Sequence, residues 1–132
     1  MIKKELINVI ITGSGAPGIA GTIYSLKEKN DFIDLKTIGT DINDSSAGRY
    51  FCDYFYLIPS FNNTDSYIDA LLEISRKHSV KIIIPQNTLE LSILNDFINI
   101  FKQKGIQILL SSGLSIEKAN NKYELLKVAK NI

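Results

Sequence analysis

Gly13-Ser14-Gly15-Ala16-Pro17-Gly18 is the stretch of this sequence that decides the fold. It follows a run of strand-forming residues, 6–12, and precedes a stretch with helical periodicity, 19–29. Three glycines at this spacing let the backbone turn sharply, let a ligand approach where no Cβ intrudes, and let the helix pack closely on its strand. Free amides at the helix N-terminus favour an anion. The stretch therefore predicts a strand-turn-helix unit that binds a phosphate or carboxylate, and the alternative is a tight turn that only packs.

Length and composition bound the class of protein. A chain of 132 residues is about one domain and can bury a core without disulfides or metals. Its net charge is +1, with acids and bases interspersed, so the sequence carries no electrostatic footprint for nucleic acid or an anionic membrane. The single cysteine, Cys52, cannot form an internal disulfide and is expected to be a small buried hydrophobe. With no signal peptide or spanning helix evident, we expect a cytoplasmic protein.

Apolar runs bounded by turn residues alternate with helical periodicity along the chain, a pattern typical of βαβ units. Five strands connected by right-handed crossovers predict an α/β fold, a Rossmann-like three-layer sandwich with a five-stranded parallel sheet in the order 3-2-1-4-5. The expected strands are 6–12, 35–41, 54–58, 80–84 and 106–110. The expected helices are about 18–29, a turn at 50–53, a helix from the 62–65 cluster to residue 78, 87–105, 115–119 and 121–130.

The loops that follow parallel strands all open at the carboxyl edge of the sheet, where ligands bind in such folds. Asp41 ends the second strand where dinucleotide-binding proteins place the carboxylate that grips the ribose, although a cap for Ser45 is an alternative role. Asn87 and Glu90 form a plausible capping box, and a ligand role stays open for both because they also reach the cleft. The expected ligand-binding residues are Gly13, Gly15, Gly18, Asp41, Asn87 and Glu90.

The sequence lacks the residue combinations of several common catalytic and metal sites. His78 is expected to be exposed near the end of its helix, with no second His or Cys to share a metal. No Ser-His-Asp grouping, no Cys-His pair and no Walker lysine after the glycines is found, so no residue is predicted to be catalytic and no metal site is expected. The sequence also contains a pattern similar to that of short-chain dehydrogenases, with glycines at Gly15-x-x-Gly18-x-x-Gly21 and a Tyr123-x-x-x-Lys127 pair. The chain is too short after Lys127 for the substrate region of that family.

The sequence as a whole resembles the N-terminal pre-ATP-grasp domain of ATP-grasp ligases, in particular of proteins similar to the carbamoyl phosphate synthase large subunit. The resemblance covers the whole chain and is carried by five segments. They are the glycine turn at 11–18, Gly39-Thr40-Asp41-Ile42-Asn43, Asp53-Tyr54-Phe55-Tyr56-Leu57-Ile58-Pro59, Ile83-Ile84-Pro85 with Glu90, and Asn121-Lys122. In the family the last pair is usually Asp-Lys, so Asn121 is a departure.

The resemblance implies a carbon-nitrogen ligase that activates a small carboxylate with ATP and magnesium as an acyl phosphate and passes it to an amine or ammonia. It implies a pre-ATP-grasp domain at 1–112 and the start of a connection to an ATP-grasp module at 113–132, with Lys122 as a nucleotide-phosphate ligand of the parent protein. That module would be the main partner, the chain alone would be inactive, and no cofactor is expected on it. A homodimer stays open. Two other readings do too: an NAD(P)- or nucleotide-binding Rossmann module, and a scaffold without a ligand of its own.

Overall fold

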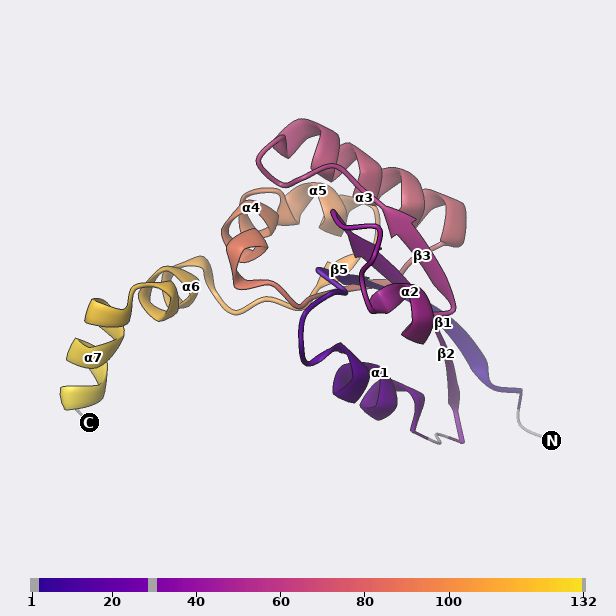
Figure 1. Ribbon diagram of the computed structural model, residues 1–132, viewed down its shortest axis with the longest axis horizontal. Helices are drawn as coiled ribbons and strands as arrows, with labels where there is room; N and C mark the ends of the chain where they lie inside the picture. The colour runs from indigo at the N-terminus through magenta and orange to yellow at the C-terminus, as the bar shows by residue number, and fades with distance from the viewer. Residues whose placement is uncertain (1–2, 29–30, 132) are drawn as a thin grey trace.

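The structure is a computed structural model that describes residues 3–28 and 31–131, and it is an α/β sandwich around one parallel sheet (Figure 1). Strand-forming runs rich in Ile and Val alternate with helices, as the periodicity predicts. The elements in chain order are β1 Glu5–Thr12, α1 Ile19–Lys27, β2 Ile33–Asp41, α2 Gly48–Phe51, β3 Tyr54–Leu57, α3 Thr64–His78, β4 Ile82–Pro85, the 3₁₀ turn η1 Thr88–Glu90, α4 Leu91–Asp96, α5 Ile98–Gln103, β5 Gln107–Ile108, α6 Gly113–Asn120 and α7 Lys122–Lys130.

The sheet has five strands in the order β3-β2-β1-β4-β5, all parallel, so the predicted fold class and strand order are confirmed. β1 pairs with β2 over its full length, from Glu5 opposite Ile33 to Thr12 opposite Thr40. The short strands β3 and β4 pair only with the carboxyl halves of β2 and β1. Burial on the two central strands accordingly rises toward their carboxyl ends, where the site residues lie.

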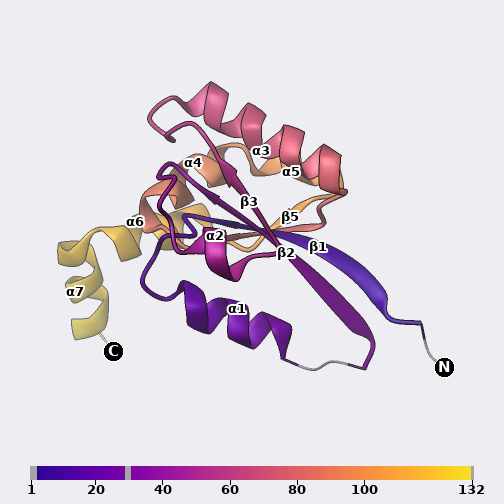
Figure 2. The same cartoon turned by 45° about the vertical axis from the view of Figure 1, so that its right-hand side comes forward.

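Helices cover both faces of the sheet (Figure 2). On one face, α3, α4 and α5 bury a core around Ile10, Ile38, Leu71 and Phe101. On the other face, α1 packs over Val9, and the start of α2 adds to the same cluster. A parallel strand covered on both faces reads as a nearly continuous apolar run, which is why β1 and β4 were predictable from the sequence.

Several predicted boundaries are wrong by a few residues. β2 begins at Ile33 rather than 35, β4 spans Ile82–Pro85 rather than 80–84, and β5 is reduced to Gln107–Ile108. The helix predicted over 87–105 is divided into η1, α4 and α5, with a bend at Phe97. Asn and Asp at positions 95 and 96 have low helix propensity, which explains a break there. The predicted end of the first helix at residue 29 lies outside the described residues.

The two C-terminal helices, α6 and α7, project away from the sheet (Figure 1). α6 contacts α4 and buries Ile116, whereas α7 has no buried residue. Asn121 accepts hydrogen bonds from Tyr123 N (3.1 Å) and Glu124 N (3.2 Å), so it caps α7 as an aspartate would. The departure from the family's Asp-Lys pair therefore leaves the start of this helix intact. Among the described residues, no helix is long and apolar enough to cross a membrane.

Candidate functional site

The glycine turn follows β1 as predicted, and its conformation requires glycine at the first position. Gly13 has φ +58°, and a Cβ there would lie 2.7 Å from Glu90 Oε1 and 2.9 Å from Asn87 Cβ. Ser14 N donates to Thr40 O (3.0 Å), which holds the turn on β2. The turn therefore combines a left-handed backbone with a close approach by the loop after β4, and both features exclude a side chain.

Asp41 at the end of β2 is bound to the turn itself. Its Oδ2 accepts a hydrogen bond from Gly15 N (2.7 Å), and its Oδ1 accepts one from Asn43 N (2.9 Å). Ser45 instead bonds Asn43, so the predicted alternative of a cap for Ser45 is wrong. The turn was expected to bind an anionic ligand. At Gly15 the Asp41 carboxylate takes that place, because it already accepts the hydrogen bond that the Gly15 N–H can donate.

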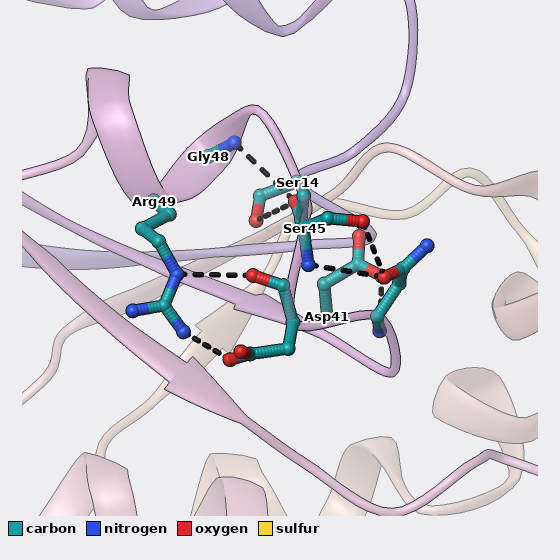
Figure 3. Close-up of polar contacts among 8 residues, drawn as sticks. Ser14, Asp41, Ser45, Gly48 and Arg49 are labelled. Carbon is teal, nitrogen blue, oxygen red and sulfur yellow. Dashed lines mark hydrogen bonds and ion pairs between the residues drawn. The ribbon is translucent and has the colours of Figure 1, made fainter.

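Ser14 fixes the second loop against the turn (Figure 3). Its hydroxyl is fully buried, lies 3.4 Å from Ser46 Oγ, and occupies space that a Cβ at Gly48 would need. Ser46 Oγ in turn accepts from Gly48 N (3.3 Å). Figure 3 also shows the Arg49 guanidinium directed to Asp44, to which it is bonded, and not to Asp41. The loop after β2 is therefore held in place beside the turn without any basic side chain entering the site.

Glu90 is the most deeply buried acid of the site, with 2% of its surface exposed. Tyr67 of α3 donates its hydroxyl proton to Glu90 Oε2, whereas Oε1 makes no hydrogen bond of ordinary geometry. Burial raises the pKa of Glu90 and the charge of Asp41 raises it further, whereas the Tyr67 and Thr12 hydroxyls and the Asn87 backbone N–H lower it. Burial and the Glu90 charge likewise raise the pKa of Tyr67, which keeps its proton. The predicted capping box is half present, since Asn87 Oδ1 accepts from Leu89 N (3.0 Å).

These groups line one cleft of about 780 Å³ at the carboxyl edge of the sheet. Five of the six predicted residues line it together: Gly13, Gly15, Asp41, Asn87 and Glu90. Gly18 does not; it is the N-cap residue of α1. Among the described residues no Lys, Arg or His lines the cleft, so its charged groups are Asp41 and Glu90 alone.

The cleft residues that were not predicted are Ala47, Ile58, Phe61 and Tyr67, whereas Gln86 lies in the loop after β4 that was expected at this edge. Tyr67 lies on the buried face of α3, and its position four residues before Leu71 was a signal that could have found it. Gln86 follows β4 directly, and its Oε1 accepts from Thr22 Oγ1 of α1 (2.9 Å). Its place at the end of a strand was the available signal, because the carboxyl edge collects such residues.

Other residues weighed from the sequence have structural roles. His78 is not exposed as predicted: it lies half-buried, with Nε2 2.7 Å from the hydroxyl of Tyr56, and burial lowers its pKa. Cys52 is half-buried against the α1 face of the sheet, and burial raises the pKa of its thiol. A thiol with a raised pKa is a poor nucleophile, as expected for a packing residue.

The described residues that line the cleft do not fit ATP or magnesium. In the described ranges, no group of three His, Cys, Asp or Glu side chains could hold a metal ion. Lys122 is exposed at the start of α7 and does not line the cleft. A triphosphate in the cleft would meet two carboxylates and no cation, so no step of a reaction is assigned to nucleotide or metal here.

The family model described as the PylC-like N-terminal domain matches residues 4–109. The chain belongs to this family. No curated protein matches it in sequence. The resemblance to the N-terminal pre-ATP-grasp domain of an ATP-grasp ligase is thereby confirmed at the level of the family and fold.

Solved structures share the fold of this PylC-like N-terminal domain. The biotin carboxylase domain of a single-chain bacterial carboxylase matches with a TM-score of 0.57 and 15% identity, over 95% of this chain and 29% of the other. The urea carboxylase of Kluyveromyces lactis matches with a TM-score of 0.56 and 20% identity, over 95% of this chain and 11% of the other. The chain thus spans less than a third of these carboxylases, and the likeness shows the fold alone.

A protein of another class matches less completely. The dTDP-glucose 4,6-dehydratase of Bacillus anthracis, solved in complex with NAD, matches with a TM-score of 0.51 and 13% identity, over 77% of this chain and 36% of the other. A shared Rossmann-like sheet accounts for this likeness, because the same fold hosts unrelated functions.

Proposed function

We propose that this PylC-like N-terminal domain is the substrate-binding part of an ATP-dependent carboxylate-amine ligase resembling the carbamoyl phosphate synthase large subunit. The observation that carries the proposal is the cleft at the carboxyl edge, where a buried acid with a free oxygen lies beside a glycine turn closed by Asp41. A cleft of this size and position is where an α/β fold holds a small ligand. The family and the fold of carboxylase domains support the class of protein.

In this proposal the ligase works through an acyl phosphate, and the cleft holds one of the two reacting molecules. ATP and magnesium would bind to a downstream ATP-grasp module, since the described residues of this chain do not fit them. Residues 113–132 would connect to that module, and Lys122 would reach the nucleotide from the first turn of α7. Binding at the cleft contributes to catalysis by orientation, because holding reactants in place removes entropy from the barrier.

The alternative, an NAD(P)-binding module, is disfavoured by one contact. In dinucleotide-binding folds the amides of the glycine turn face the pyrophosphate, and the acid after the second strand binds the ribose. Here Asp41 and Gly15 N bind each other at 2.7 Å, so both groups would have to separate before a dinucleotide could enter.

Titration calorimetry with NAD(H) and NADP(H) tests the choice. We expect no stoichiometric binding of either, and tight binding would overturn the ligase proposal. The gene downstream of codon 132 offers a second test, since an ATP-grasp module continuing in frame is the expected finding. An unrelated domain there, or a dinucleotide-dependent enzyme, would contradict it.

A further inference from the structure

We propose that the cleft binds the cationic amino group of a substrate, between Glu90 and Asp41, and does not bind a phosphate or carboxylate. The inference rests on the proposed function and identifies which of the two reacting molecules the cleft holds. The juxtaposition that carries it is a pair of acids, one of them deeply buried, in a cleft that no described basic side chain lines.

The first step concerns the glycine turn. Its Gly15 amide already donates to Asp41 Oδ2, and Ala16 N donates to Gly13 O (3.0 Å). An anion entering the cleft would compete with a carboxylate that already accepts from Gly15 N of the turn and from Asn43 N of the loop after β2. It would also approach two acids without a compensating cation, and like charges at close range oppose binding.

The second step concerns Glu90. Glu90 is buried and lines the cleft, and Tyr67 donates to its Oε2. Its Oε1 has no donor within ordinary hydrogen-bond geometry, although the Thr12 hydroxyl and the Asn87 backbone N–H lie near enough to lower the pKa of the carboxyl group. A buried acceptor left without a full partner is unfavourable, so native structures rarely keep one without a water, ion or ligand. An ammonium group brings three donors and a positive charge, which matches the open oxygen of Glu90 on one side and the negative charge of Asp41 on the other.

The third step concerns shape and charge around the pair. The titratable groups that act on Glu90 are Tyr67 from α3 and Asp41 from β2, and neither supplies a positive charge. Ile58 and Phe61 line the same cleft and offer apolar surface for the carbon chain of a ligand. The cleft therefore suits an alkylamine head group followed by a short hydrocarbon stem.

The test uses the 132-residue chain labelled with ¹⁵N and four probes of matched size or opposite charge: butylammonium, butan-1-ol, butyrate and inorganic phosphate. We expect saturable shifts of the Gly13, Gly15 and Asn87 amides with butylammonium only. Glu90→Gln should weaken that binding at least about tenfold, because it removes the charge and keeps the shape. Asp69→Asn, which removes an exposed acid of α3 outside the cleft, should leave it unchanged.

The pH gives a readout that needs no variant. Protonation removes the Glu90 charge, so butylammonium binding to the native chain should weaken between pH 7 and pH 4. Binding of butan-1-ol as strong as that of butylammonium would overturn the inference even if Glu90→Gln fails to fold. So would unchanged affinity in folded Glu90→Gln, or no binding of any probe.

The two proposals fail in different ways. Butyrate or phosphate binding in the cleft overturns the amine inference and leaves the ligase proposal standing, with the other reacting molecule in the cleft. Tight NAD(H) binding there overturns both. Amine binding in the cleft supports the inference and agrees with the proposed function.

Discussion

At the scale of single residues, side chains of the turn and of β2 pack directly against the backbone of neighbouring glycines. Ser14 occupies the volume above Gly39 and Gly48, and Asp41 occupies the amide of Gly15. The glycines of this site are thus required by neighbouring protein atoms, as well as by any guest. That distinction separates glycines whose replacement is costly from glycines whose replacement is not.

Gly48→Ala is expected to destabilise the chain by about 1 to 3 kcal/mol, the usual cost of inserting a methyl group where no space exists. Its Cβ would overlap Ser14 Oγ and Cβ. The measurement is the free energy of unfolding by urea. Gly21→Ala is the matched control, because nothing lies within 4 Å of its Cβ in α1, and it should be neutral or stabilising by up to about 1 kcal/mol.

Ser14→Gly combined with Gly48→Ala should recover part of that loss, since the overlapping side-chain atoms are removed. The Ser14 carbonyl oxygen, 3.0 Å from the new Cβ, would remain. Equal stabilities of Gly48→Ala and Gly21→Ala would show that the loop after β2 moves freely away from Ser14.

Glu90 is expected to reduce stability as the pH rises. Its pKa is raised in the folded chain, so the folded state holds the proton more tightly than the unfolded state. This contribution is fully present below the unfolded pKa, near 4.5, and is lost as the pH rises through the folded pKa. Glu90→Gln should therefore gain stability relative to the native chain between pH 4 and pH 7, by about 1.4 kcal/mol for each unit of pKa shift.

The measurement is urea unfolding of both proteins across that range, with Asp69→Asn as the control for loss of an exposed acid. A difference between Glu90→Gln and the native chain that does not change with pH would contradict the raised pKa.

At the scale of elements, the sequence determines most of the sheet and the turn, and much less of the cleft. β1 and β4 were predictable because a strand buried on both faces is an apolar run, and the glycine turn because strand and helix patterns flank it. The bend at Phe97 was missed because the apolar spacing of 91–101 continues through it. The Tyr67-Glu90 and Asp41-Gly15 contacts join residues 23 and 26 positions apart, which local patterns do not report.

α7 is expected to be frayed in the isolated chain. It contacts α6 but buries no residue, and Leu125, Leu126 and Val128 are exposed on it. An isolated helix of nine residues is marginal in water, because packing supplies most helix stability. Hydrogen exchange measured on dilute protein should show α7 amides exchanging roughly 100-fold or more faster than those of α3, which buries five residues.

Protection of α7 comparable to that of α3 at low concentration would contradict this expectation. Repeating the measurement on concentrated protein detects self-association, because protection from pairing of the exposed leucines rises with concentration while protection within one chain does not. Amides of α6 serve as the internal control, since Ile116 anchors that helix.

At the scale of the whole molecule, the chain combines a cleft at the edge of the sheet with an exposed apolar surface on α7. The sheet positions Glu90, Asp41 and the turn, whereas α7, which carries exposed apolar residues, lies at the far end of the molecule from the start of β1 (Figure 2). Exposed apolar side chains gathered on one helix mark a contact surface. The proposed ligase gives both features a place, one for a substrate and one for a neighbouring module.

The chain alone is expected to release no phosphate from ATP. Phosphoryl transfer depends on magnesium and cations around the phosphates, and the described residues offer no metal-binding group and one exposed candidate lysine, Lys122. The assay contains ATP, magnesium, bicarbonate and either ammonia or an amino acid, and runs the 132-residue chain beside a form extended through the downstream gene. We expect turnover by the extended form only.

Phosphate release by the 132-residue chain would contradict the proposal that ATP binds to a downstream module, because the cleft would then have to bind a triphosphate next to two carboxylates. If neither form releases phosphate with any of these acceptors, the ligase proposal is contradicted, because amine binding in the cleft would then not be linked to any reaction.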